Sequence, residues 1–234
     1  MTATDNPSVN PTTITPARLS ALSDGIIAIA ATLLVLDIRA PIAAAAVWPA
    51  LGHEWPSLVG YVVSFLIIGI AWIHHHNLFH QVRAVDRTLL LLNLGMLLTI
   101  GFLPVPTATI GEHLAGGHDA TGAAVFYGAA LTLTSVWFTL FWQHLYRHPE
   151  LLQPGGVEAA RRARRTSLIG PVGYLAATAL ALATPIGSVL VEAGLVVWFV
   201  VGRAAPAGRT GAPVTNEAGG DAAGSAGSGT TSGS

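Results

Sequence analysis

The sequence predicts an all-α membrane protein with six transmembrane helices. Of its 234 residues, 52% are hydrophobic and only 10% are charged, and the mean hydropathy is +0.58. A soluble domain usually carries about 25% charged residues, so this chain has too few charges to solvate a large surface. The lack of cysteine excludes disulfides and thiol chemistry, and the net charge of −1 argues against general nucleic-acid binding.

The first apolar segment, residues 17–39, begins with a helix start signal, because Pro16 suits the first helical position. About 21 residues at roughly 1.5 Å per residue span about 30 Å, the thickness of a hydrocarbon core. Ile29, Leu33 and Leu36 recur at helical spacing and form an aliphatic stripe. Much of the remaining surface is small, which lets other helices approach closely.

The later spans are bounded by prolines, tryptophans and charged turns. The tryptophans and prolines of residues 48–56 are typical of a membrane–water interface. The stretch 166–202 contains one charged residue, Glu192, and is long enough for two spans broken at Pro185. The expected spans after the first are 57–80, 88–110, 120–143 and the two halves of 166–202, with a polar loop at 111–119 and an arginine-rich connection at 147–165.

The arginines predict the orientation of these spans. With the N-terminus inside the cell, every arginine except Arg39 falls on the cytoplasmic side, as the positive-inside rule requires. We therefore expect a multi-pass protein of the plasma membrane with both termini cytoplasmic. Residues 1–15 and 204–234 are polar or small and are predicted to be disordered, which leaves 16–203 as the transmembrane domain.

A polar motif opens the first span: Arg18 is followed by Ser23 and Asp24, and then by an uncharged run to Leu36. This pattern resembles the R-x-x-x-F-S-D signature of the transmembrane protein 175 family of potassium channels, with Leu22 in place of the phenylalanine. The resemblance continues in the second and third spans, in Phe65-x6-Trp72-x3-His76, in Asn93 and in Leu103-Pro104-x-Pro106.

The resemblance implies a potassium-permeable channel that works by passive conduction, without a carbonyl-lined filter loop and without a cofactor. It also implies a homotetramer in which the first helix of each chain lines the pore. Four copies of the aliphatic stripe would then form rings of Ile29, Leu33 and Leu36, which can gate by dewetting. Thr32 would present a hydroxyl near the constriction, or bond back to its own helix. Without the resemblance, these positions would more often be core or lipid-facing.

The polar residues of the motif are predicted to hold the fold rather than to contact ions. Buried polar groups in a membrane need partners, so we expect a network between the start of the first span and the polar end of the second. The predicted members are Arg18, Ser23, Asp24, Trp72, His76 and Asn93.

Other interpretations stay open. A proton-coupled secondary transporter would use Asp24, His76 and Glu192, although the spans show no clear internal repeat. The histidines of residues 74–80 could bind zinc, since His76 and His80 share a helical face, but no nearby carboxylate or cysteine completes a ligand set. An enzyme is not expected, because the chain has no nucleophile–base set and no H-E-x-x-H motif. Glu192 is either protonated or close to the outer surface.

Overall fold

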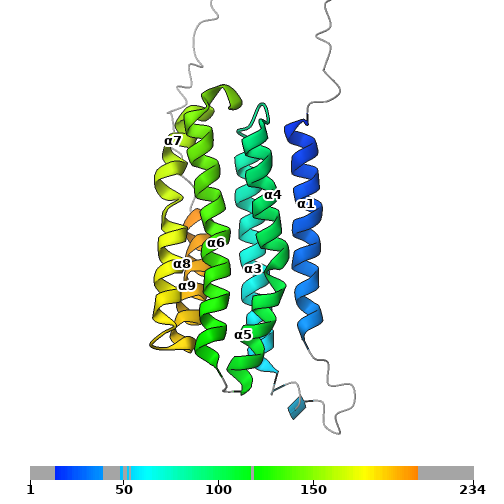
Figure 1. The fold of residues 1–234 in the computed structure, drawn as a ribbon, viewed down its shortest axis with the longest axis vertical. Coiled ribbons are helices and arrows are strands. Elements are labelled where there is room, and N and C mark those ends of the chain that lie inside the picture. Colours follow the sequence, from blue (N-terminus) through cyan, green and yellow to red (C-terminus); the bar gives the residue numbers. More distant parts are fainter. Residues whose placement is uncertain (1–13, 39–47, 50–51, 53, 117–118, 205–234) are drawn as a thin grey trace, which may run out of the picture.

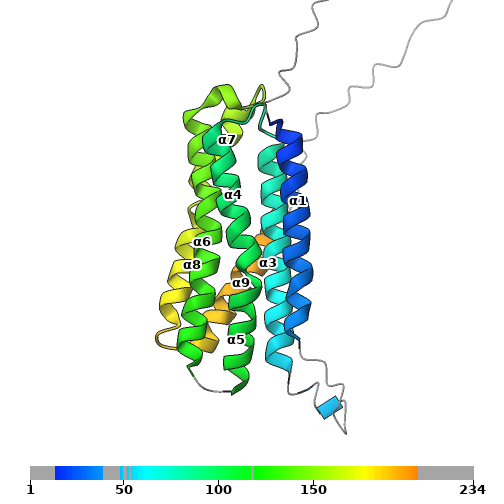
Figure 2. The same ribbon diagram turned by 45° about the vertical axis from the view of Figure 1, so that its right-hand side comes forward.

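The computed structural model describes residues 14–38, 48–49, 52, 54–116 and 119–204. Within these ranges the named elements are helices that run mostly along one axis and form a bundle (Figures 1 and 2). They are α1 (Pro16–Leu33), α3 (Trp55–Phe79), α4 (Arg87–Phe102), α5 (Pro104–Gly116), α6 (Ala120–Arg147), α7 (Gly156–Thr166), α8 (Ile169–Leu180) and α9 (Pro185–Ala204), with the short 3-10 helices η1 (Leu34–Asp37) and η2 (Pro149–Leu151).

The predicted all-α, six-helix architecture is confirmed. The segments Pro16–Leu36, Trp55–Phe79, Arg87–Leu114 and Ala120–Arg147 are each long and apolar enough to cross a membrane, with a mean hydropathy of 1.6 to 2.1. The last two helices have shorter apolar segments: α8 has 12 residues, and the apolar part of the 20-residue helix α9 is Pro185–Phe199. Of the predicted tails 1–15 and 204–234, residues 1–13 and 205–234 lie outside the described residues, and so does Arg39.

One predicted connection is wrong in part, and another contains a helix. Residues 111–116 continue α5 instead of starting a polar loop. The helix α5 begins at Pro104, which suits a first helical position because the N–H that proline lacks would have no intrahelical partner there. Only Leu103 separates α4 from α5. Within the connection 147–165, residues from Gly156 onward form the amphipathic helix α7, which runs beside α6 above α8 (Figure 1).

Hydrogen bonds close the end of the bundle where α1 begins. Thr15 caps α1 by accepting from the amide of Arg18. Asp86 caps α4 by accepting from the amide of Leu89 at 2.7 Å, and its second oxygen pairs with His144 of α6 at 2.9 Å. One carboxylate therefore joins the start of α4 to the end of α6.

A second chain of hydrogen bonds ties α5 to two other helices at mid-bundle. The hydroxyl of Thr107 donates to Ser64 of α3 at 2.8 Å, and Ser64 lies 2.9 Å from the phenol of Tyr127 on α6. All three side chains are buried. Because each buried hydroxyl has a partner, this polar path is compatible with an apolar core.

Gly95 allows α4 to pack closely on Trp137 of α6. A Cβ at position 95 would lie 2.5 Å from the indole ring, whose N–H donates to Thr99 at 2.9 Å and so fixes the ring. We expect Gly95→Ala to destabilise the protein by about 1–3 kcal/mol through overpacking. The measurement is the midpoint of thermal unfolding in detergent.

The matched control is Gly101→Ala in the same helix, where a Cβ would meet no atom within 4 Å. That variant should be neutral or slightly stabilising, because glycine is less favourable than alanine in a helix interior by about 1 kcal/mol. Equal midpoints for the two variants would contradict the packing argument.

Candidate functional site

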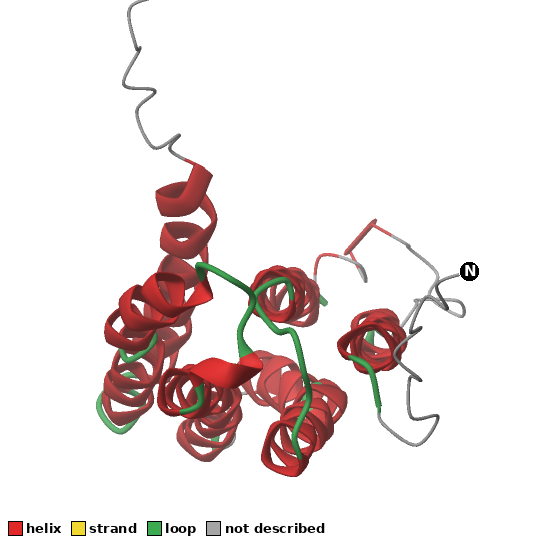
Figure 3. Ribbon diagram, turned by 90° about the horizontal axis from the view of Figure 1, so that it is seen from above, coloured by secondary structure: helices red, strands yellow, loops and turns green. Residues whose placement is uncertain are grey.

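The helix α1 has two unlike faces. One face packs on α3 and α4 through Leu19, Ser23, Ile27 and Ala30, all of which are buried. The helix stands at the edge of the bundle seen from above, so its opposite face meets no other described helix (Figure 3). The exposed residues of that face are Leu22, Gly25, Ile29, Thr32, Leu33 and Leu36.

The structure brings together all four residues predicted to line a pore. Ile29 is 59% exposed and Leu36 is 74% exposed, although both are large and aliphatic. Thr32 lies between them, and its hydroxyl donates to the carbonyl of Ile29 at 2.9 Å. With its proton used in this way, the hydroxyl oxygen keeps its lone pairs directed away from the helix. The face is an apolar stripe with one polar interruption.

A buried polar network holds the other face of α1. The amide nitrogen of Asn93 donates to the hydroxyl of Ser23 at 3.0 Å, and its oxygen accepts from Nε2 of His75 at 2.9 Å. All three side chains are fully buried. Since an amide oxygen can only accept, His75 carries its proton on Nε2, and its Nδ1 has no hydrogen-bond partner in the described part of the chain. The network joins α1, α3 and α4.

A second contact lies nearer the surface, between α1 and α3. The indole N–H of Trp72 donates to Asp24 at 2.8 Å. The same ring stacks on His76 with 5.6 Å between ring centroids, and Nε2 of His76 lies 3.0 Å from Nε2 of His80. Asp24 therefore has a hydrogen-bond partner on α3, and it forms no ion pair with Arg18.

The residues predicted to form one network thus belong to two separate groups of contacts, and the members are not all those that were predicted. Arg18 is exposed, and within the described residues its side chain has no ion-pair or hydrogen-bond partner. His76 contributes a stacked ring, while His75, which the sequence interpretation did not include, makes the buried hydrogen bond. The sequence signal for it is its spacing of four and three residues from Ala71 and Leu78, with which it shares a buried stripe of α3, but that spacing does not by itself exclude His74 or His76.

Glu192 lies in a different part of the bundle. It is fully buried on α9, where it packs against α6 and α8, so its carboxyl group does not lie on the surface of the bundle. Gly128 makes the space for it, since a Cβ there would lie 2.7 Å from the carboxyl oxygen and 2.3 Å from the hydroxyl of Thr178. Neither carboxyl oxygen has a hydrogen-bond partner among the described residues. The transporter hypothesis would favour a place for Glu192 close to Asp24 and His76, but the structure does not bring these residues together.

The histidines of α3 also separate. His74 packs against Phe138 and Phe199 on one side of the helix, and His75 is buried on another. In the part of the chain that the structure describes, no group of three His, Cys, Asp or Glu side chains is placed to hold a metal ion.

The fold and the two faces of α1 define a multi-pass membrane protein built on one six-helix repeat. Residues 18–104 match the family model described as the endosomal/lysosomal potassium channel TMEM175. A potassium channel of Streptomyces collinus is 42% identical over 160 residues, which cover 67% of this chain and 78% of that protein. The chain belongs to the TMEM175 family, a family of channels.

Two further comparisons extend this result. The crystal structure of a lysosomal potassium-selective channel TMEM175 homolog from Chamaesiphon minutus superposes with a TM-score of 0.72 at 30% identity, covering 81% of this chain and 98% of that one. The mouse endosomal/lysosomal proton channel TMEM175 is 32% identical over 184 residues, which are 70% of this chain but only 36% of the mouse protein.

The role of Asn93 can be tested by replacing it with a side chain of similar size. Asn93→Leu leaves Nε2 of His75 buried without its partner and leaves Ser23 with only its bond to the carbonyl of Leu19, and an unsatisfied buried group costs about 1–3 kcal/mol. We expect a clear fall in the thermal midpoint and in the folded yield. Trp72→Phe is the control, since it removes one hydrogen bond at a residue that is 41% exposed and should cost about 1 kcal/mol or less. A control that is as damaging as Asn93→Leu would show that the buried network does not anchor α1.

Proposed function

We propose that this chain forms a potassium-permeable cation channel in which four copies surround one pore and α1 of each copy lines it. The observation that carries the proposal is the exposed apolar face of α1, which one chain leaves uncovered. One helix cannot enclose water, but several copies around an axis would turn this stripe into stacked rings. Membership of a channel family supports passive conduction over a proton-coupled transporter.

The proposed constriction consists of rings of Ile29, Leu33 and Leu36. Their side chains offer no hydrogen-bonding group to an ion that sheds water, so the barrier is one of dehydration and width. Thr32 supplies the one hydroxyl on this face, between Ile29 and Leu36. The proposed permeant is potassium, the ion named for the bacterial relatives, and conduction by this route requires no cofactor.

The proposed orientation places the start of α1 in the cytoplasm. The arginines of the 83–87 turn and of α7 lie at the same end of the bundle as the start of α1 (Figure 1). The positive-inside rule assigns that end to the cytoplasm, which supports two cytoplasmic termini and a place in the plasma membrane.

The proposed channel predicts a specific number of assembled chains. If α1 is central, its uncovered face must meet the same face of other copies, so crosslinking of the purified protein in mild detergent should step up to four chains. Mass photometry of the same sample should give the matching mass. A strict monomer or dimer under these conditions would remove α1 from the centre of a tetrameric pore.

The proposed constriction predicts that substitutions of Ile29 change conduction. Ile29→Ala widens the proposed ring, and Ile29→Asn adds amide groups that can replace water around an ion. Both variants should raise single-channel conductance and reduce the discrimination between potassium and sodium. Thr32→Ala should have a smaller effect, confined to selectivity. The measurement is the current and the reversal potential in planar bilayers under a potassium/sodium gradient, which also reports whether the parent protein conducts potassium without a coupled solute.

The control for Ile29 is Leu98→Ala, which truncates an aliphatic side chain that is 76% exposed on α4. That variant should leave conductance and reversal potential unchanged, because α4 is not proposed to line the pore. An Ile29→Ala variant as silent as Leu98→Ala would place Ile29 against lipid.

A further inference from the structure

The helix α7 carries a concentration of positive charge at the end of the bundle where α1 begins. Its small residues Gly156 and Ala160 are buried. The arginines at positions 161, 162, 164 and 165 are exposed. Arg161 lies 3.6 Å from Glu158, and Arg164 lies over the ring of Tyr146 at 4.7 Å. Within the described residues, Arg162 and Arg165 have no carboxylate partner.

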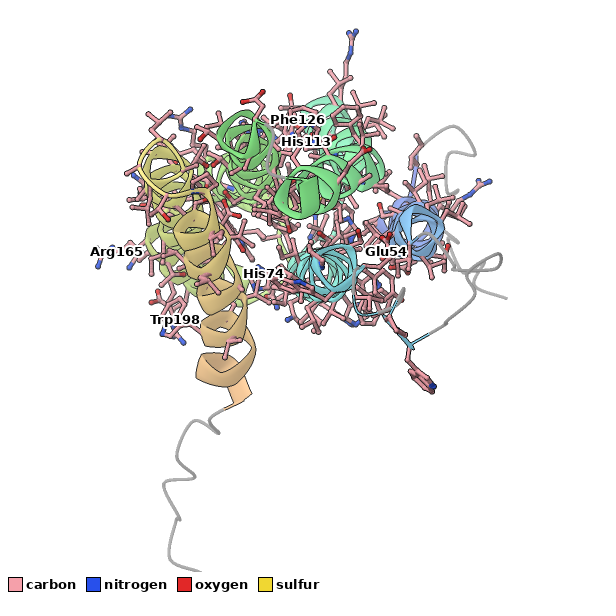
Figure 4. The ribbon with its side chains drawn as sticks, turned by 90° about the horizontal axis from the view of Figure 1, so that it is seen from below. Glu54, His74, His113, Phe126, Arg165 and Trp198 are labelled. Atoms are coloured by element: carbon pink, nitrogen blue, oxygen red, sulfur yellow. The ribbon has the colours of Figure 1, made fainter. Side chains whose placement is uncertain are left out.

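A partly open cavity of about 130 Å³ lies beside the C-terminal end of the same helix. Its walls come from α3, α6, the junction of α7 and α8, and α9. Phe138 and Phe199 form apolar walls and both pack edge-on against His74, at 5.7 Å and 5.9 Å between ring centroids. Thr166 and Ala163 of α7 border the cavity. Figure 4 shows His74 facing α9 and Arg165 on the outer side of the bundle.

The positive charge and the cavity lie at the same end of α7, because Thr166, which borders the cavity, directly follows Arg165. A ligand bound here would have an anionic group on the arginines and an apolar portion beside Phe138 and Phe199. The exposed apolar residues Leu168 and Ile169 come next in the chain, so this surface lies at the boundary between the polar and apolar parts of the bundle.

We propose that α7 and the adjacent cavity form a binding site for an anionic phospholipid. The guanidinium groups of Arg162 and Arg165 bind the phosphate, a group that arginine matches with paired N–H donors. A segment of one acyl chain enters the cavity between Phe138 and Phe199. A zwitterionic phospholipid lacks the net charge that this surface complements, since basic clusters on amphipathic helices at a membrane select anionic lipids. The site lies on the side of the bundle opposite α1 (Figure 1) and does not depend on the proposed pore.

The test uses the purified full-length chain in detergent, with dioleoyl phosphatidylglycerol or dioleoyl phosphatidylcholine added in increasing amounts. A ligand that binds the folded state but not the unfolded state raises the thermal midpoint, and the rise grows with the ratio of the ligand concentration to its Kd. We expect phosphatidylglycerol to raise the midpoint and phosphatidylcholine to raise it less. Arg162→Gln with Arg165→Gln should weaken the apparent affinity for phosphatidylglycerol by about tenfold for each lost contact, the size of a charge-assisted hydrogen bond.

The matched control is Arg83→Gln with Arg87→Gln, which removes the same charge from two exposed arginines at the same end of the bundle but outside α7. This variant should keep the parent response. Thr166→Phe fills the mouth of the cavity at an exposed position, so it should fold and should lose the advantage of dioleoyl over short-chain dihexanoyl phosphatidylglycerol.

Three results would overturn the proposal. Equal loss in the two arginine pairs would show a general response to surface charge. An equal response to inorganic phosphate and to dioleoyl phosphatidylglycerol would show an anion site without a lipid. An unchanged preference for the long acyl chains in Thr166→Phe would show that the cavity takes no part in binding.

Discussion

The position of α1 depends on one amide side chain. Asn93 donates to Ser23 and accepts from His75, so a single buried residue of α4 holds both α1 and α3. In a membrane, each of these groups would be costly without its partner, since lipid offers no hydrogen bonds. The network therefore fixes the rotation of α1 about its own axis. It directs the Ser23 side inward and, as a consequence, turns the stripe of Ile29 and Leu36 outward.

The two faces of α1 are thus set by different physics. The inner face consists of the buried hydroxyl of Ser23, which is paired with Asn93, together with small and aliphatic residues. The outer face has no polar group to satisfy except Thr32, whose hydroxyl is bonded to its own helix. Such a face can meet another copy, lipid or a water-filled lumen without breaking any hydrogen bond. This freedom is what a channel helix requires if its surroundings change between states.

Much of this arrangement was predictable from the sequence, because apolar length sets the spans and periodicity sets their faces. The stripe of Ile29, Leu33 and Leu36 needed only a spacing of three and four residues. The buried hydrogen-bond network was harder to predict from the sequence, because a run of three histidines does not say which ring is buried. His75, not His76, reaches Asn93, and that depends on how α3 rotates against α4. The restart of the helix at Pro104 was missed because proline either ends a helix or begins one. Glu192 was flagged by its cost in an apolar span, but the space that Gly128 leaves for it depends on tertiary packing.

The single-residue interruption at Leu103 divides the third span into two halves that are held by different hydrogen bonds. Its first half, α4, is bound to α1 and α3 through Asn93 and to α6 through Asp86 and Thr99, whereas its second half, α5, is bound to α3 and α6 through Thr107 and Ser64. Between the halves, Pro104 and Pro106 remove the amide protons that would bond back to the carbonyls of Ile100 and Phe102. Two backbone hydrogen bonds are therefore absent where α4 meets α5, so the third span bends more easily at this point than a continuous helix would.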